Sequence, residues 1–287
     1  MRRLFLFAHF DRDDLVDQYV LEYLSALAQL GSIIFISTSR LRSSEIAKVR
    51  RYTLRALSRP NVGYDFMSWQ LGLKLVEGCG RYDEIVICND SVYAPIFPLA
   101  EMFEVMEQSP APYWGVTSNS QIARHIQSYF AVFRRPVLER MEFWQFWENV
   151  RPQQSKNAVI EAYEVGLSRA LERLGLFGET YFSLDGVLND ALMNLKSFSV
   201  LPLIVPLLSS WEPMNGSRLL TGEYNKTLVL WRELMLARVP MLKVQLLREH
   251  LSGEPSENVL VLLEKYTSYP VHTIRSHLER MHNGEPL

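Results

Sequence analysis

The sequence predicts an α/β fold, in which a mostly parallel central sheet carries helices on both faces. Between residues 4 and 107, short apolar runs typical of buried strands alternate with longer segments whose apolar residues recur at helical spacing. Gly31 and Gly78 stand directly after two of these helical segments, at the position where a helix commonly ends. In such folds ligands bind beyond the carboxyl ends of the strands, so we expect the functional site there.

The elements of this core follow from the same patterns. Leu15–Leu30 carries its apolar residues at helical spacing, and serines stand at the start of Ser44–Leu57, where they favour the beginning of a helix. In chain order we expect a strand at Leu4–Ala8, a helix at Leu15–Leu30, a strand at Ile33–Ser37, helices at Ser44–Leu57 and Phe66–Glu77, a strand at Glu84–Cys88 and a helix from about Pro98 to Glu107.

The next part of the chain predicts further elements of the same domain. Residues 113–117 and 127–133 are typical of strands, and Lys156–Leu174 is an amphipathic segment that ends at Gly175. The aromatic residues of the segment 141–150 are more often packing than a platform for carbohydrate.

The last third has a different composition and predicts an appendage. We expect residues 1–200 to form the main domain, and residues 201–287 to form a mainly helical extension packed on it. Within the extension, 225–250 predicts a helix broken at Pro240, and Pro270–Met281 predicts an amphipathic terminal helix.

Composition excludes several classes of function. The chain has 30 Lys and Arg against 32 Asp and Glu, without the basic excess that binds nucleic acid. Cys79 and Cys88 form no CxxC pair, which argues against structural zinc and suggests a reducing compartment. Leu4–Ala8 is too short for the core of a signal peptide, and Val200–Leu208 is too short to span a bilayer. We expect a cytoplasmic protein, with peripheral association at the inner face of the membrane left open.

Polar clusters follow three of the predicted strands. They are His9-Phe10-Asp11, Ser37-Thr38-Ser39 and Asn89-Asp90-Ser91. Ser37 and Ser39 are typical of residues that cap the start of the next helix. Asp90 does not, because Tyr93, Ala94 and Pro95 separate it from the next helix. We therefore expect Asp90 to lie at the ligand edge of the sheet.

The sequence also resembles a known family. The segments LFAHFDRDDLVDQYVLEYL, NVGYDFMSW, YDEIVICNDSVYAPIFPL, YWGVTSN, HIQSYFAVFRR, VIEAYEVGLS and MLKVQLLREH resemble, in this order, those of the rhamnan synthesis F family. These are glycosyltransferase-like proteins of bacterial rhamnose-polysaccharide and O-antigen assembly. The wider resemblance is to glycosyltransferases of the GT-A fold, especially family 2 rhamnosyltransferases, and it implies that residues 1–200 form a GT-A-like nucleotide-sugar-binding and catalytic domain.

The resemblance assigns residues to a nucleotide-sugar donor. Asn61-Val62-Gly63 is similar to an Asn-x-Gly segment near the donor, and Asn89-Asp90-Ser91 stands where an Asp-x-Asp motif is expected. In that motif, carboxylates hold Mg²⁺ or Mn²⁺ against the donor diphosphate. This chain has a single carboxylate there, Asp90, so metal dependence stays open. The expected donor-binding residues are His9, Asp11, Asn61, Gly63, Tyr64, Asp65, Asn89, Ser91 and Lys243.

The late basic residues allow two interpretations. Lys243, Arg248 and His250 follow Pro240, and they fit a diphosphate site, a helical cover over the nucleotide site or a solvated basic face.

The resemblance also suggests a general base. Glu164 corresponds to the second acidic position of a Glu-Asp-x-Asp-Leu segment, where an acid removes the proton of the acceptor hydroxyl. Glu161 and Asp11 are the alternatives. We expect Tyr93, His125 and Ser128 to face the sugar or the acceptor.

Taken together with the patterns of the chain, this resemblance implies a glycosyltransferase. It would move rhamnose or a related deoxysugar from dTDP-rhamnose or a GDP-sugar to a polysaccharide or lipid-linked acceptor, with inversion at the anomeric carbon. Two alternatives stay open. One is a catalytically inactive glycan- or nucleotide-sugar-binding assembly module of the same fold. The other is a phosphoryl-transfer enzyme that uses Asp11 and Asp13 as a nucleophile pair.

Overall fold

The structure is a computed structural model of the whole chain. The structure describes residues 1–76, 80, 82–120, 122–182, 226–253 and 255–282. The expected boundary at residue 200, the apolar segment Val200–Leu208 and Cys79 lie outside the described residues. No helix in the described ranges combines the length and the apolar character needed to cross a membrane.

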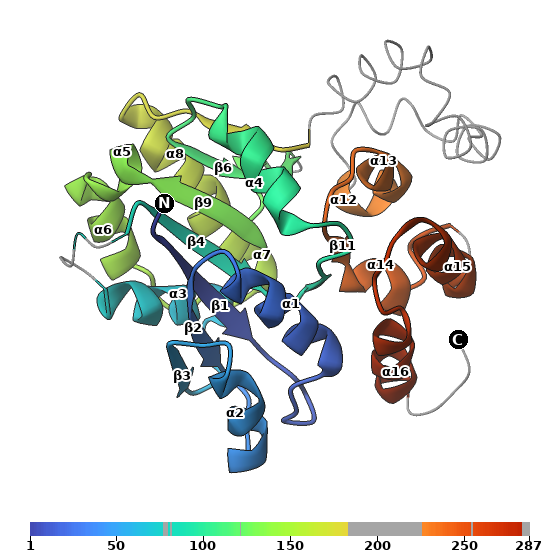
Figure 1. Cartoon of the computed structure of the whole chain (residues 1–287). Coiled ribbons are helices and arrows are strands. Elements are labelled where there is room, and N and C mark those ends of the chain that lie inside the picture. Colours follow the sequence, from blue (N-terminus) through green and yellow to red (C-terminus); the bar gives the residue numbers. More distant parts are fainter. Residues whose placement is uncertain (77–79, 81, 121, 183–225, 254, 283–287) are drawn as a thin grey trace, which may run out of the picture.

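A seven-stranded sheet forms the centre of the molecule (Figure 1). All neighbouring strands are parallel except at β9, which is antiparallel to both of its neighbours. This confirms the mostly parallel sheet. The strands, in their order across the sheet, are β10 (Gly178–Thr180), β6 (Tyr113–Gly115), β9 (Phe130–Arg134), β4 (Glu84–Asn89), β1 (Arg3–His9), β2 (Ser32–Ser37) and β3 (Arg55–Ser58).

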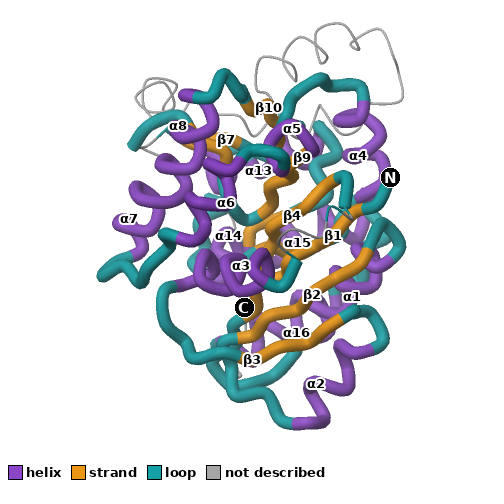
Figure 2. The backbone as a smooth tube through the Cα atoms, turned by 90° about the vertical axis from the view of Figure 1, so that its left-hand side faces the viewer, coloured by secondary structure: helices purple, strands orange, loops and turns teal. Residues whose placement is uncertain are grey.

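Helices cover both faces of this sheet. In Figure 2 the strands, drawn in orange, extend from β3 near the bottom to β10 near the top, with helices around them. Alternate residues of β1 point to opposite faces, so Phe5 and Phe7 belong to one hydrophobic cluster and Leu4 and Leu6 to another. The first cluster includes α1 (Gln18–Ala28) and α4 (Leu99–Glu107), and the second includes α3 (Tyr64–Lys74), α6 (Met141–Glu148) and α8 (Gly166–Arg173). Shorter helices are α2 (Ser43–Arg50), α5 (Arg135–Leu138) and α7 (Lys156–Val159).

The aromatic segment packs inward, as its spacing predicts. Phe143 and Trp147 of α6 are 1% and 2% exposed and belong to the second cluster. They therefore offer no platform to a sugar.

The C-terminal part docks against the core through a small sheet. Its strand β11 (Leu242–Lys243) pairs antiparallel with β5 (Val92–Tyr93), which follows β4. Its helices contribute to the same hydrophobic cluster as α1 and α4. These helices are α12 (Lys226–Val229), α13 (Trp231–Leu236), α14 (Val244–Arg248), α15 (Ser256–Tyr266) and α16 (His272–Met281). A further pair of short strands, β7 (Ser118–Asn119) and β8 (His125–Ile126), lies beside the main sheet.

Three expectations about elements need correction. The helix expected over Ser44–Leu57 ends at Arg50, and Arg55–Ser58 form β3, because backbone pairing with β2 overrides the local pattern. The helix expected over 225–250 is not merely broken at Pro240, since β11 lies between its two halves. The segment Lys156–Leu174 is helical, but its middle turn, Ile160–Val165, is a π-helix.

Candidate functional site

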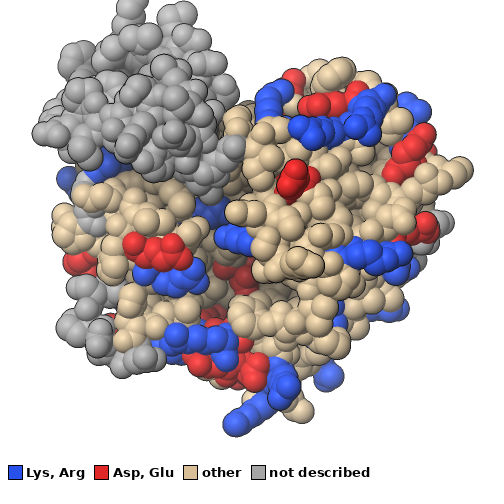
Figure 3. Space-filling view, turned by 180° about the vertical axis from the view of Figure 1, so that it is seen from behind, with Lys and Arg blue, Asp and Glu red and all other residues tan. Residues whose placement is uncertain are grey.

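A cavity of about 680 Å³ opens at the carboxyl ends of the strands. It lies where the strand order reverses: β1 continues to β2 and β3 on one side, whereas β4 lies on the other. Such a switch point is the usual ligand site of open α/β sheets. The face shown in Figure 3 is hollowed between the C-terminal helices and the sheet, and acidic and basic side chains both lie in and around the hollow.

Asp90 joins the ends of the two central strands at the floor of this cavity. Its Oδ2 accepts a hydrogen bond of 2.8 Å from the backbone N–H of Phe10, and its carbonyl accepts one of 3.1 Å from the Tyr19 hydroxyl. Burial, and next the negative charge of Asp65, raise the pKa of Asp90 well above its usual value. An ionised Asp90 is therefore costly unless a cation accompanies it.

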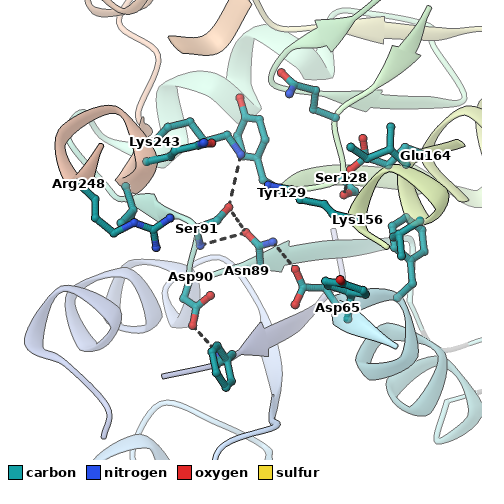
Figure 4. Close-up of a pocket in the computed structure, with 18 of the residues that line it drawn as sticks. Asp65, Asn89, Asp90, Ser91, Ser128, Tyr129, Lys156, Glu164, Lys243 and Arg248 are labelled. Atoms are coloured by element: carbon teal, nitrogen blue, oxygen red, sulfur yellow. Dashed lines mark hydrogen bonds between the residues drawn. The ribbon is translucent and has the colours of Figure 1, made fainter. Parts of the chain in front are cut away.

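A chain of hydrogen bonds runs along one wall (Figure 4). Asn89 Nδ2 donates to Asp65 Oδ2 at 2.8 Å, and the Ser91 hydroxyl donates to Asn89 Oδ1 at 2.7 Å. Lys243 Nζ donates to the Ser91 oxygen at 3.4 Å. Asp65 enters from the first turn of α3, where a carboxylate is favoured by the helix dipole. The network thus connects α3, β4 and β11.

Lys243 reaches the cavity from the C-terminal part. Its ammonium group lies 3.7 Å from the centre of the Tyr129 ring, in a cation–π contact. Burial lowers the pKa of Lys243 to about 7. Three further basic residues, Arg12, Lys156 and Arg248, line the same cavity. The site therefore combines the buried Asp90 with basic side chains from distant segments.

Glu164 lines the cavity from the π-helical turn. Ser155 caps the preceding helix, its Oγ accepting a hydrogen bond of 3.2 Å from Ala158 N, and π-helical turns are frequent at functional sites. The Ser128 hydroxyl donates to Glu164 Oε1, and His125 Nε2 lies 3.0 Å from Oε2. Burial alone would raise the pKa of Glu164, but the ion-pair contact with His125 and the hydrogen bond from Ser128 outweigh burial and hold it below its usual value. Glu164 is thus ionised at neutral pH.

Nine of the sequence-predicted site residues line this one cavity. They are Asp11, Tyr64, Asp65, Asn89, Asp90, Ser91, Ser128, Glu164 and Lys243. Their roles stay predictions.

Five others do not line it. His9 is buried beneath Asp90, its Nδ1 2.9 Å from Ser37 Oγ, and burial lowers its pKa to about 4. Tyr93 is buried with its hydroxyl 2.8 Å from His277 Nδ1. His125 lies behind Glu164.

Asn61 and Gly63 stand outside the cavity, in the loop before α3. Asn61 is exposed. Gly63 has a φ of 76°, and a Cβ there would come within 2.4 Å of Met67 Cγ. This glycine therefore serves the start of α3, and it brings Tyr64 and Asp65 to the cavity.

Asp11 lies at the rim, but its carboxylate already has partners. Arg280 of α16 forms ion pairs with Asp11, Asp13 and Asp17. Asp11 Oδ1 also accepts backbone hydrogen bonds from Asp13 and Leu15. Burial would raise the pKa of Asp11, but Arg280 holds it below its usual value. These contacts argue against Asp11 and Asp13 as a nucleophile pair. Likewise, Glu161 is exposed and does not line the cavity.

Sequence motifs gave no signal for several of the lining residues. Lys156 stands at a helix start without a motif, and Tyr129 is one aromatic residue among many. Arg248 faces the cavity, whereas His250 is exposed and pairs with Ser256 at 3.2 Å. The structure thus places Lys243 and Arg248 at the cavity and His250 outside it, a distinction that the sequence alone does not make.

A divalent cation fits this cavity only together with phosphate oxygens from a ligand. Within the described part of the chain, no three His, Cys, Asp or Glu side chains are grouped so that they could hold a metal. Mg²⁺, however, is commonly bound by one or two carboxylates and the phosphates of a substrate. Asp90 is the residue that would hold such a cation.

Comparison with known proteins gives a family match over most of the described core. The family model described as "Rhamnan synthesis protein F" matches residues 33–201. Virulence protein VirA of Vibrio anguillarum is 26% identical over 204 residues, which are 69% of this chain and 64% of that protein. Uncharacterized protein y4gN of Sinorhizobium fredii is 21% identical over 195 residues, 66% of this chain and 51% of that protein. The chain thus spans about half to two thirds of the length of these curated relatives.

Solved structures show more distant similarity. The mannosyltransferase PcManGT of Pyrobaculum calidifontis, in complex with GDP-Man and Mn²⁺, is 11% identical with a TM-score of 0.41, covering 99% of this chain and 89% of that one. A putative nucleotide-diphospho-sugar transferase of Desulfovibrio desulfuricans is 11% identical with a TM-score of 0.42, covering 63% of this chain and 80% of that one.

Proposed function

The chain belongs to the rhamnan synthesis protein F family, and from this premise we propose that it is a GT-A-type glycosyltransferase that uses a nucleotide-sugar donor. One observation carries the proposal. Asp90, at the carboxyl end of β4, and the ionised Glu164, on the π-helical turn, line a single cavity at the switch point of the sheet. Such a pair suits a reaction that needs one acid at a diphosphate and another at an acceptor hydroxyl.

The donor diphosphate would lie between Asp90 and the basic side chains. Lys243, Lys156 and Arg248 supply positive charge at this place, which would attract the negative charge of a diphosphate. A divalent cation held by Asp90 would neutralise further charge on the departing nucleotide. The Asn89 side chain, fixed by Asp65 and Ser91, keeps this end of β4 in place.

Glu164 would act as the general base. It would take the proton of the acceptor hydroxyl while that oxygen attacks the anomeric carbon, in a single displacement that inverts the centre. Ser128 donates to Oε1 and so orients the carboxylate.

The family name supports a rhamnose donor. We propose dTDP-rhamnose, or else a GDP-sugar, as donor and a growing polysaccharide or lipid-linked O-antigen precursor as acceptor. A lipid-linked acceptor would bring the protein to the inner face of the cytoplasmic membrane. The chain spans only about half to two thirds of the length of the curated relatives. The partners of the whole protein are therefore part of this proposal.

A thermal-shift panel tests donor binding. A ligand at one hundred times its Kd stabilises the folded state by about 2.7 kcal/mol, or about 5–10 °C for a chain of this size. We expect dTDP-rhamnose or a GDP-sugar to raise the Tm by this amount with Mn²⁺ or Mg²⁺ present, and less in Asp90→Asn. No response of the wild type to any nucleotide-sugar would contradict the proposal.

A binding module without turnover is the second candidate, because only one carboxylate stands where a metal is expected. Donor hydrolysis separates the two candidates. Turnover that falls in Asp90→Ala supports the enzyme, whereas donor binding with equal, background hydrolysis in both proteins supports the module.

A further inference from the structure

His125 and Glu164 form a buried pair whose geometry fixes the position of one proton. The ring belongs to β8 and its side chain is 1% exposed. Its Nδ1 lies 2.7 Å from the carbonyl oxygen of Ala123, and its Nε2 lies 3.0 Å from Glu164 Oε2. Each ring nitrogen therefore lies close to an oxygen, Nδ1 in a hydrogen bond and Nε2 in an ion-pair contact.

The chemistry of these partners leaves few choices. A carbonyl oxygen only accepts, so Nδ1 must carry a hydrogen. A neutral imidazole has one N–H, and Nε2 would then turn a bare lone pair toward an ionised carboxylate. That arrangement is repulsive, so a second proton must lie between Nε2 and Oε2, bound to one of them.

The surrounding charges place this proton on the imidazole. Burial alone would lower the pKa of His125, but the ion-pair contact with Glu164 and the hydrogen bond to the Ala123 carbonyl outweigh burial and raise it. Arg124, Tyr113 and Glu172 line the small cavity on the far side of the ring. Across the main cavity, the positive charge of Lys243 helps to lower the pKa of Glu164. The negative charge of Glu164 in turn helps to raise the pKa of Asp65.

We propose that His125 is the positioning residue of the general base: it holds a proton against Oε2 and thereby keeps Glu164 ionised and oriented toward the acceptor hydroxyl. The inference rests on the proposed function, which makes Glu164 the base. His125 does not touch the substrate, since it does not line the cavity.

The transfer step then balances as follows. The acceptor oxygen forms a bond to the anomeric carbon, and the bond from that carbon to the donor phosphate breaks, its electron pair leaving with the nucleotide diphosphate. The acceptor proton passes to Glu164. His125 keeps its own proton throughout, and the extra proton on Glu164 leaves to solvent before the next turnover.

Histidine NMR tests the pair without any substrate. Ring signals of His125 are those that disappear in His125→Gln, and His272, which is exposed, is the internal control. We expect His125 to titrate above pH 6.5 in the wild type and about one pH unit or more lower in Glu164→Gln, with His272 unchanged. A pKa at or below 6.5 in the wild type, or no change in Glu164→Gln, overturns the pair.

Kinetics test the role. Gln retains a hydrogen-bond donor but lacks the positive charge. We therefore expect kcat of His125→Gln to fall about 10- to 100-fold, the loss typical when a residue that hydrogen-bonds to a metal ligand is replaced. The donor KM should stay unchanged, and the acid limb of the pH profile should move to higher pH. His125→Ala should lose more, and His272→Gln nothing. A wild-type profile in His125→Gln overturns the inference alone, whereas a wild type without turnover overturns the proposed function together with it.

Discussion

Asp90 lowers the stability of the folded protein when no ligand is bound. Its carboxyl group is held at the junction of β1 and β4 by the N–H of Phe10, in surroundings that raise its pKa. A carboxyl group with a pKa higher in the folded than in the unfolded state contributes stability below its unfolded pKa. This contribution is lost as the pH rises through the folded pKa, so at neutral pH Asp90 weakens the protein without ligand.

Asp90→Asn should therefore stabilise the protein and impair its function. The amide oxygen can still accept from Phe10 N, and the cost of a buried charge disappears. We expect the Tm at pH 7 to rise by about 2–4 °C, the equivalent of about 1 kcal/mol, with the gain vanishing near pH 4 and donor binding weakened. Asp83→Asn is the control, because Asp83 is paired with Arg135 outside the cavity. A lower Tm for Asp90→Asn, or an equal gain at pH 4 and pH 7, would contradict this account.

At the scale of elements, β11 places Lys243 at the cavity, and the charge of this lysine depends on pH. Burial lowers the pKa of Lys243 to about 7, so its charge is lost between about pH 6 and pH 8. A nucleotide-sugar carries a diphosphate whose charge is constant over this range. The donor should therefore bind more weakly as the pH rises, by up to about tenfold over the two units.

Lys243→Arg separates this effect from others, because arginine stays charged. We expect the donor Kd of this variant to be nearly independent of pH, measured by calorimetry at pH 6 and pH 8. Lys156→Arg is the matched control and should keep the wild-type dependence. Equal pH dependence in wild type and Lys243→Arg would place the titrating group elsewhere.

Elements were predictable where a local pattern decides them. The apolar run before Asn89 predicts β4 and the edge at which it ends, and both are as expected. β3 was missed because Arg55–Ser58 has no strand pattern of its own and is a strand only through pairing with β2. The π-helical turn is equally invisible, since nothing in Ile160–Val165 distinguishes it from an α-helix.

At the scale of the whole molecule, the site depends on contacts between the two ends of the chain. Figure 1 shows α16 beside α1, and Arg280 there pairs with Asp11, Asp13 and Asp17. Through β11 and α14, the same C-terminal part supplies Lys243 and Arg248 to the cavity.

Arg280→Met should loosen this arrangement. It removes a cation from three carboxylates, of which Asp13 keeps a contact with Arg12, and hydrogen bonds to charged groups contribute about 1.5–3 kcal/mol each at most. We expect a lower Tm, faster proteolysis of the C-terminal part and weaker donor binding. Arg275→Met is the control, because Arg275 pairs only with Glu257 and Glu264 of the neighbouring α15 among the contacts described. Equal effects of both substitutions would show that docking does not depend on Arg280.

Long-range contacts of this kind mark the limit of prediction from the sequence. Asp90 and Glu164 could be placed at one site because strand ends and a resembling segment point to them. The partnership of Asp11 with Arg280 could not, since 269 positions of chain separate the two residues. It also changes the interpretation of Asp11 from a free acid to an ion-paired one.

The most direct test of the central claim is the rate of sugar transfer by Glu164→Gln. Glutamine keeps the size of the side chain and can accept from Ser128, but it cannot take a proton. With dTDP-rhamnose or whichever donor stabilises the wild type, and an acceptor glycan, we expect transfer to slow by about 10²- to 10⁴-fold while donor binding stays within a factor of a few. Transfer at the wild-type rate in Glu164→Gln would contradict the assignment of this cavity as the catalytic site.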